Sequence, residues 1–157
     1  MTKILLSLHV LAAIVAIGPV TVAASMFPPA ARRASAALGG APGLSAVGTV
    51  ALLHRICRVY SGIGLTVPVL GLATGAAMGV LDSGWLVTSI ALTAAAAGIL
   101  AAFVLPRQEE LLGRLNGEQA VEHRNTARLA MFTGIFNLLW ATVTVLMIVR
   151  PGSTTGA

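Results

Sequence analysis

Four apolar runs without a charged side chain constrain the fold of this chain more than any other feature. They cover residues 4–27, 59–80, 85–105 and 129–149, and none of them contains lysine, arginine, aspartate or glutamate. A helix of about 20 apolar residues crosses the hydrocarbon core of a bilayer. Spanning strands would instead need alternating segments of about ten residues, which are not seen. The pattern predicts an all-α, membrane-embedded four-helix bundle in a single domain, residues 1–157.

Composition agrees with this prediction. Apolar residues make up 57% of the chain and charged residues 10%, whereas about 25% charged residues is usual for soluble domains. This excludes an ordinary soluble enzyme and, despite the net charge of +5, a nucleic-acid-binding domain. The single cysteine, Cys57, excludes a disulfide framework and a cysteine-based zinc site. The lipid bilayer is therefore the first expected partner.

Prolines mark the expected ends of the spans. Pro28 and Pro29 are predicted to end the first helix and Pro106 the third, because proline removes a backbone hydrogen bond. None of the spans shows a charged pair or a visible break, which argues against a small-solute transporter. Between the spans, residues 28–58 and 106–128 form two long joins. Residues 34–44 are expected to be a flexible link, whereas residues 46–58 are expected to be helical.

The second join is expected to form a helix. Glu110 and Arg114 are four residues apart, in the order that favours a helical ion pair. Asn116 and Gln119 are spaced as in a capping box, which predicts that the last helix begins near Glu118. Three leucines of this segment are expected to lie on the membrane surface: Leu111, Leu112 and Leu115.

Arginine distribution predicts the orientation. The two joins contain eight arginines, whereas Lys3 and Arg150 are the only basic residues on the other side. Cytoplasmic loops carry the excess of positive charge. We therefore expect a multi-pass plasma-membrane protein with both joins in the cytoplasm and both termini outside. The alternative is that residues 1–24 are a cleaved signal peptide, but Arg32 and Arg33 follow this run and favour a retained helix.

Small residues recur every four positions in the second and third runs. Such spacing lets helix backbones approach closely in a membrane. This pattern predicts a packing surface, either inside the bundle or against a second copy or a partner membrane protein. The residues are Gly71, Gly75, Gly79, Ala94, Gly98 and Ala102.

His9 is the one histidine inside a run, about 7 Å below the outer surface at 1.5 Å per residue. An ionisable group within the membrane suggests a functional site. Neutral imidazole binds haem iron or a metal, and Met78 and Met147 lie at a similar depth as candidate second ligands. The alternative is a neutral histidine that hydrogen-bonds to a neighbouring helix.

Two His-Arg pairs precede the second and fourth runs at similar distances. This arrangement predicts a weak two-helix duplication about an axis along the membrane normal. The two pairs would then converge at one cytoplasmic level and bind an anion, such as the phosphate of an anionic lipid. Alternatively, these residues only set the topology. They are His54, Arg55, Arg58, His123, Arg124 and Arg128.

The stretch Leu8-His9-Val10-Leu11-Ala12-Ala13-Ile14, followed by Gly18, resembles the first helix of a group of bacterial four-helix membrane proteins. The group includes copper-resistance-D-like proteins, HemJ-type protoporphyrinogen oxidases and predicted integral membrane proteins. In the HemJ-type enzymes the first-helix histidine is associated with haem, so the resemblance implies haem at His9. The uncharacterised predicted integral membrane proteins of the group are the closest match. Where the HemJ-type enzymes have a Trp-x-Gly-Gly-like stretch, residues 16–19 read Ala-Ile-Gly-Pro.

Two hypotheses for function follow. No nucleophile, paired-carboxylate site or phosphate-binding loop is visible, so the first hypothesis is a structural or accessory subunit without catalytic activity. The second is a haem- or copper-binding membrane protein that uses His9. The absorption spectrum of the purified protein discriminates between them.

Overall fold

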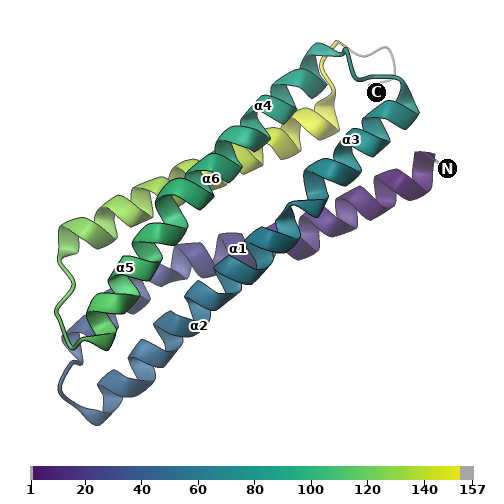
Figure 1. The fold of residues 1–157 in the computed structure, drawn as a ribbon. Helices are drawn as coiled ribbons and strands as arrows, with labels where there is room; N and C mark the ends of the chain where they lie inside the picture. Colours follow the sequence, from purple (N-terminus) through teal and green to yellow (C-terminus); the bar gives the residue numbers. More distant parts are fainter. Residues whose placement is uncertain (1, 153–157) are drawn as a thin grey trace.

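The structure is a computed structural model that describes residues 2–152, apart from the side chains of residues 41–43. Within this part of the chain all regular elements are helical (Figure 1). They are α1 (Thr2–Ala36), α2 (Ala41–Gly64), α3 (Thr66–Met78), α4 (Gly84–Ile99), the π-helix η1 (Leu100–Val104), α5 (Leu105–Asn116) and α6 (His123–Val149). Among the described residues, four helical stretches are long and apolar enough to cross a membrane. This confirms the all-α prediction with four apolar helices.

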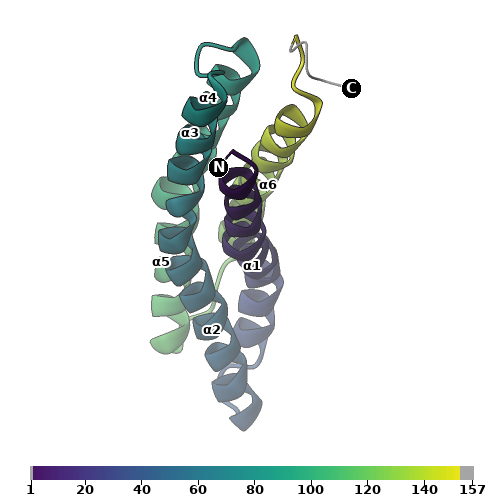
Figure 2. The same ribbon diagram turned by 90° about the vertical axis from the view of Figure 1, so that its right-hand side faces the viewer.

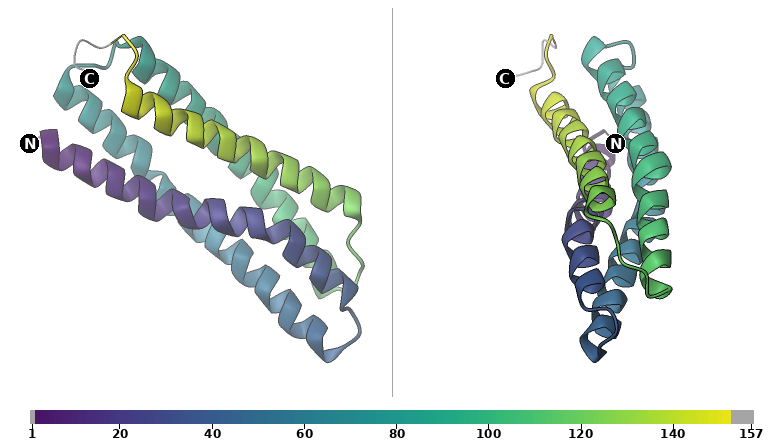
Figure 3. Two further views of the ribbon diagram at one scale, coloured as in Figure 1. Left: turned by 180° about the vertical axis from the view of Figure 1, so that it is seen from behind. Right: turned by 90° about the vertical axis from the view of Figure 1, so that its left-hand side faces the viewer.

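The helices form four long rods that run alternately up and down. α1 packs against α2, α3 and α6, while α4 packs against α6 and α5 packs against α2. Figure 2 shows α1 and α6 in one layer and α3 and α4 in the other. Figure 3 shows that α1 begins and α6 ends at the same end of the bundle. We call this the terminal end. The opposite end contains the turns between α1 and α2 and between α5 and α6, and we call it the basic end.

The first and third helical rods extend beyond the ends that the proline positions predict. α1 continues through Pro28 and Pro29 to Ala36, and helix continues past Pro106 to Asn116. An internal proline costs about 3 kcal/mol or more in a helix. In α1 this cost is offset by apolar burial, since Phe27, Ala31 and Ala34 are fully buried. The predicted ends at these prolines are therefore wrong. The predicted link over residues 34–44 shortens to residues 37–40.

The second rod contains a tighter turn at Leu65, between α2 and α3. Pro68 has no amide hydrogen, so the carbonyl of Gly64 lacks its usual helical donor. At the same point the amide of Leu65 donates to Gly62 O, three residues earlier, at 3.2 Å, which makes a tighter turn than an α-helix. Leu65 itself keeps a right-handed helical backbone, with φ −63° and ψ −20°, and Leu44–Met78 forms one candidate membrane span. The second rod is therefore tightened at this residue rather than broken.

The third rod passes through the π-helix η1 just before Pro106. The amide of Leu105 donates to the carbonyl of Leu100, five residues earlier. The buried residues Ala96, Leu100, Val104 and Gln108 are spaced by four, a spacing that drifts around a 3.6-residue helix and suits a wider turn. Beyond the π-helix, α5 packs against α2 and α1, whereas η1 itself packs against α6.

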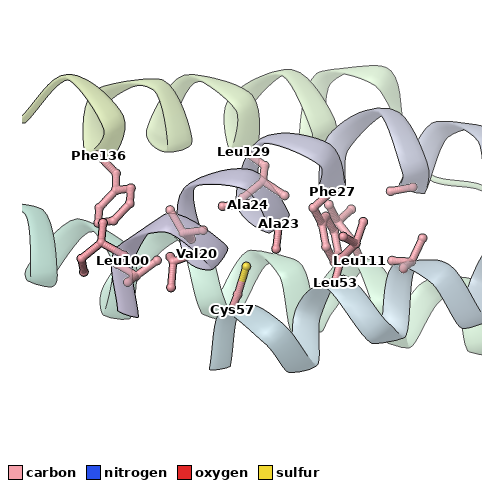
Figure 4. Packing of buried hydrophobic residues seen from close by; sticks show 14 of the residues in the cluster. Val20, Ala23, Ala24, Phe27, Leu53, Cys57, Leu100, Leu111, Leu129 and Phe136 are labelled. Carbon is pink, nitrogen blue, oxygen red and sulfur yellow. The ribbon is translucent and has the colours of Figure 1, made fainter. Parts of the chain in front are cut away.

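The core is concentrated in the basic half of the bundle. Figure 4 shows how some of its side chains pack between the helices. Leu111 and Leu115 of α5 are each only 2% exposed and belong to it. Leu112 is partly buried and packs against it. The prediction that these leucines lie on the membrane surface is wrong. The long joins are instead continuations of the same helical bundle, as expected for residues 46–58 and for the helix of the second join.

A turn over residues 117–122 separates α5 from α6. Asn116 ends α5 rather than capping a new helix, and α6 begins at His123 instead of near Glu118. Glu118 adopts a left-handed conformation, with φ 54°. The amide of Val121 donates to Ser35 Oγ at 2.8 Å, which ties this turn to the end of α1. The predicted Glu110–Arg114 pair is present at 3.3 Å.

Candidate metal centre

His9 lies half-buried on α1 and faces α3. Its Nδ1 is 3.0 Å from the carbonyl oxygen of Val67. A carbonyl can only accept, so Nδ1 carries the hydrogen and Nε2 of the neutral ring keeps its lone pair. Metal-binding histidines usually donate the other ring N–H to a carboxylate, a backbone carbonyl or water. His9 therefore bonds to a neighbouring helix and at the same time keeps one nitrogen available as a ligand.

Gly71 makes room for the His9 ring. A Cβ atom at position 71 would lie 2.9 Å from His9 Cε1, which is closer than van der Waals contact allows. The ring cannot move away without weakening its bond to Val67. Glycine at this position thus allows the imidazole to lie against the backbone of α3.

A small cavity of about 30 Å³ adjoins His9 at the terminal end. A buried water needs about 10–15 Å³ by this kind of measure, so the cavity has room for one ion or about two to three water molecules. Met78 and Met147, both predicted from their depth, line the same cavity as His9. The complete lining is Leu6, His9, Gly71, Thr74, Gly75, Met78, Val80, Trp85, Leu86, Met147 and Arg150.

The available donors are neutral and soft. One imidazole nitrogen and two thioether sulfurs match Cu(I), whereas Zn(II) prefers thiolate, imidazole and carboxylate ligands. Within the described residues, His, Cys, Asp and Glu form no group of three that could hold a metal. The donor set at this cavity therefore fits a monovalent soft ion better than a divalent one.

Arg150 and Trp85 line the same cavity and contact each other. The guanidinium of Arg150 lies 5.7 Å from the ring centre of Trp85, and Arg150 Nε donates to Met147 O at 3.3 Å. The positive charge of Arg150 opposes a bound cation, and it opposes a divalent ion about twice as strongly as a monovalent one. Trp85 Nε1 is buried without a hydrogen-bond partner among the described residues.

The cavity does not fit a haem. Pockets for organic ligands measure about 300–1,000 Å³, far more than the roughly 30 Å³ next to His9. The haem b alternative would require the helices of the terminal end to separate.

The predicted small-residue surface does not form one continuous interface. Gly75 faces the side chains of Leu81 and Leu86, so it serves packing inside the bundle. Gly79 adopts φ 66° and ends α3, with the amide of Val80 donating to Gly75 O at 3.1 Å. This is a Schellman C-cap, for which glycine is the usual residue. The other three, Ala94, Gly98 and Ala102, are exposed on α4 and η1.

The structure does not bring the predicted His-Arg set together. His54 is 9% exposed and its Nδ1 lies 3.2 Å from Gln108 Oε1. Arg55 and Arg58 are exposed on α2. The others, His123, Arg124 and Arg128, are exposed on α6, and α2 and α6 are not neighbours in the bundle. The two histidines thus differ in environment, and the expected duplication about a central axis is not seen.

Gln108 was missed by the sequence analysis. It is fully buried, and its Nε2 donates to Cys57 Sγ at 3.5 Å while its Oε1 faces His54. This network satisfies the polar atoms that α2 and α5 bury against each other. Its signal in the sequence is the spacing of Gln108, Leu111 and Leu115, which places all three on one helical face.

Comparisons with known proteins give no match. No family model matches the chain, no curated protein matches its sequence, and no solved structure matches its fold.

Proposed function

We propose that this protein binds one Cu(I) ion at the terminal end of a four-helix membrane bundle, without catalysing a reaction itself. The observation that supports the proposal is that His9, Met78 and Met147 come from three different helices and line one small cavity. The hydrogen bond from His9 Nδ1 to Val67 leaves Nε2 as the ligand atom. The resemblance of the first helix to copper-resistance-D-like proteins agrees with this choice of metal.

The proposal includes an orientation in the plasma membrane. The arginines of the basic end favour the cytoplasmic side, so the cavity would face the outside. An impermeant maleimide should therefore label Ser83→Cys in intact cells but not Gly39→Cys, both made in a Cys57→Ala background. The reverse labelling pattern would contradict the orientation.

Metal titration tests the site directly. The purified wild type is expected to bind one equivalent of Cu(I), or of Ag(I) as its air-stable substitute, with a change in Trp85 emission. A Trp140→Phe background isolates that signal, since the chain has two tryptophans. His9→Gln, Met78→Leu and Met147→Leu should each weaken binding ~10–100-fold or more. Leucine preserves the volume of methionine while removing the sulfur.

Two other methionines provide matched controls. Met26 and Met131 are 53% and 54% exposed and do not line the cavity. Met26→Leu and Met131→Leu should therefore bind copper like the wild type. Equal losses in all four leucine variants, or no binding of one equivalent by the wild type, would contradict the proposal.

A structural or accessory subunit is the second candidate. The exposed stripe of Ala94, Gly98 and Ala102 favours it, because small residues allow a helix of another copy or of a partner to approach. A protein that binds no copper, and whose oligomeric state in detergent changes with Gly98→Ile, would support this candidate over the first.

A further inference from the structure

A stacked pair of aromatic rings connects η1 to α6, close to the residue where α5 begins. The rings of Phe103 and Phe132 lie with their centroids 4.8 Å apart and an angle of 13° between their planes. The guanidinium of Arg107 lies 5.2 Å from the centre of the Phe132 ring. A cation–π contact holds the guanidinium while the N–H groups at its edge can still bind an anion.

A second arginine lies on the same face. Arg128 precedes Phe132 by four residues on α6, so the two side chains share one side of that helix. Arg107 and Arg128 therefore both lie toward the basic end from the aromatic pair. Neither arginine forms a salt bridge with another described residue, and the nearby Glu110 is paired with Arg114 at 3.3 Å.

The position of these residues matches the boundary of a membrane. Phe103 and Phe132 fall inside the charge-free runs 85–105 and 129–149, whereas Arg107 and Arg128 lie just outside them. Acyl chains of a lipid would thus meet the rings, and its headgroup would meet the arginines. Arg107 is half-buried and Arg128 is exposed, so both guanidinium groups keep accessible N–H groups on this side of the bundle.

We propose that Arg107 and Arg128 bind the phosphodiester of one anionic phospholipid, whose acyl chain lies against Phe103 and Phe132. Arginine binds phosphate oxygens through charge-assisted, often bidentate hydrogen bonds. This site replaces the larger convergent set expected from the sequence, because it unites arginines of α5 and α6 instead of α2 and α6. It is independent of the copper site, which lies at the opposite end of the bundle.

Native mass spectrometry of delipidated protein, titrated with phosphatidylglycerol or phosphatidylcholine, tests this site. We expect the wild type to bind one phosphatidylglycerol more tightly than phosphatidylcholine. Arg107→Gln and Arg128→Gln should each weaken that binding about tenfold or more, as expected for loss of a hydrogen bond to a charged group. Phe103→Leu should weaken binding of both lipids while the preference for phosphatidylglycerol remains.

Arg55→Gln is the matched control, since Arg55 is an exposed arginine of the basic end on α2. It removes the same charge and should leave binding within about twofold. Thermal unfolding of each variant checks that the fold is intact. Equal losses for all three arginine variants, or equal affinity for the two lipids, would overturn the proposal. Displacement of the lipid by millimolar inorganic phosphate would assign the arginines to free phosphate and overturn the lipid assignment.

Discussion

Leu111→Ala is expected to lower the free energy of unfolding by about 2–5 kcal/mol, the usual cost of truncating a buried leucine. Leu111 is 2% exposed and lies in the core that joins α1, α2 and α5. Hydropathy alone would place this residue at a membrane surface, where truncation costs little. Thermal or denaturant unfolding in mild detergent, followed by circular dichroism, measures the difference.

Leu44→Ala is the control for this loss, because Leu44 is 81% exposed near the start of α2. The same chemical change should then shift stability by no more than about 0.5 kcal/mol. If both variants unfold like the wild type, the basic end is not a packed continuation of the bundle. Similar destabilisation by both variants would also contradict the packing described here.

Gly71→Ala is expected to remove copper binding almost as completely as His9→Gln. The added methyl group would lie 2.9 Å from His9 Cε1, and the ring can yield only by weakening its bond to Val67. Overpacking of this kind also costs about 1–3 kcal/mol of stability. The Ag(I) titration and a thermal unfolding curve measure the two effects separately.

Gly98→Ala tests whether the loss of copper binding and of stability is specific to position 71. A Cβ atom at position 98 would meet no heavy atom within 4 Å apart from the backbone of its own helix and its chain neighbours, and alanine favours helix more than glycine does. This variant should bind metal normally and be at least as stable as the wild type. Wild-type metal affinity in Gly71→Ala would show that His9 is not held by this contact.

The four apolar helices could be predicted because charge-free runs of about 20 residues are the pattern of helices that can cross a bilayer. The ends of the helices could not. Proline penalties are local, whereas the burial of Phe27 and Leu111 that outweighs them depends on the whole bundle. The π-helix at Leu100–Val104 is similarly a compromise between Pro106 and the packing of α5.

The candidate site was partly visible in the sequence. His9 is the one histidine within a span, and counting residues from the span ends placed Met78 and Met147 at a similar depth. The contributions of Gly71, Trp85 and Arg150 depend on how the helices are rotated against one another, and hydropathy does not encode this. The same limit explains why His54, adjacent to Arg55, is buried against Gln108 rather than exposed to headgroups.

X-ray absorption at the copper K-edge tests the proposed metal site most directly. Protein loaded with one equivalent of Cu(I) is expected to show a monovalent edge and a first shell of one nitrogen and two sulfur atoms. Met78→Leu and Met147→Leu should each remove one sulfur, and Met131→Leu should remove none. A first shell of nitrogen and oxygen alone, or one that is unchanged in both cavity variants, would contradict a copper site built from His9, Met78 and Met147.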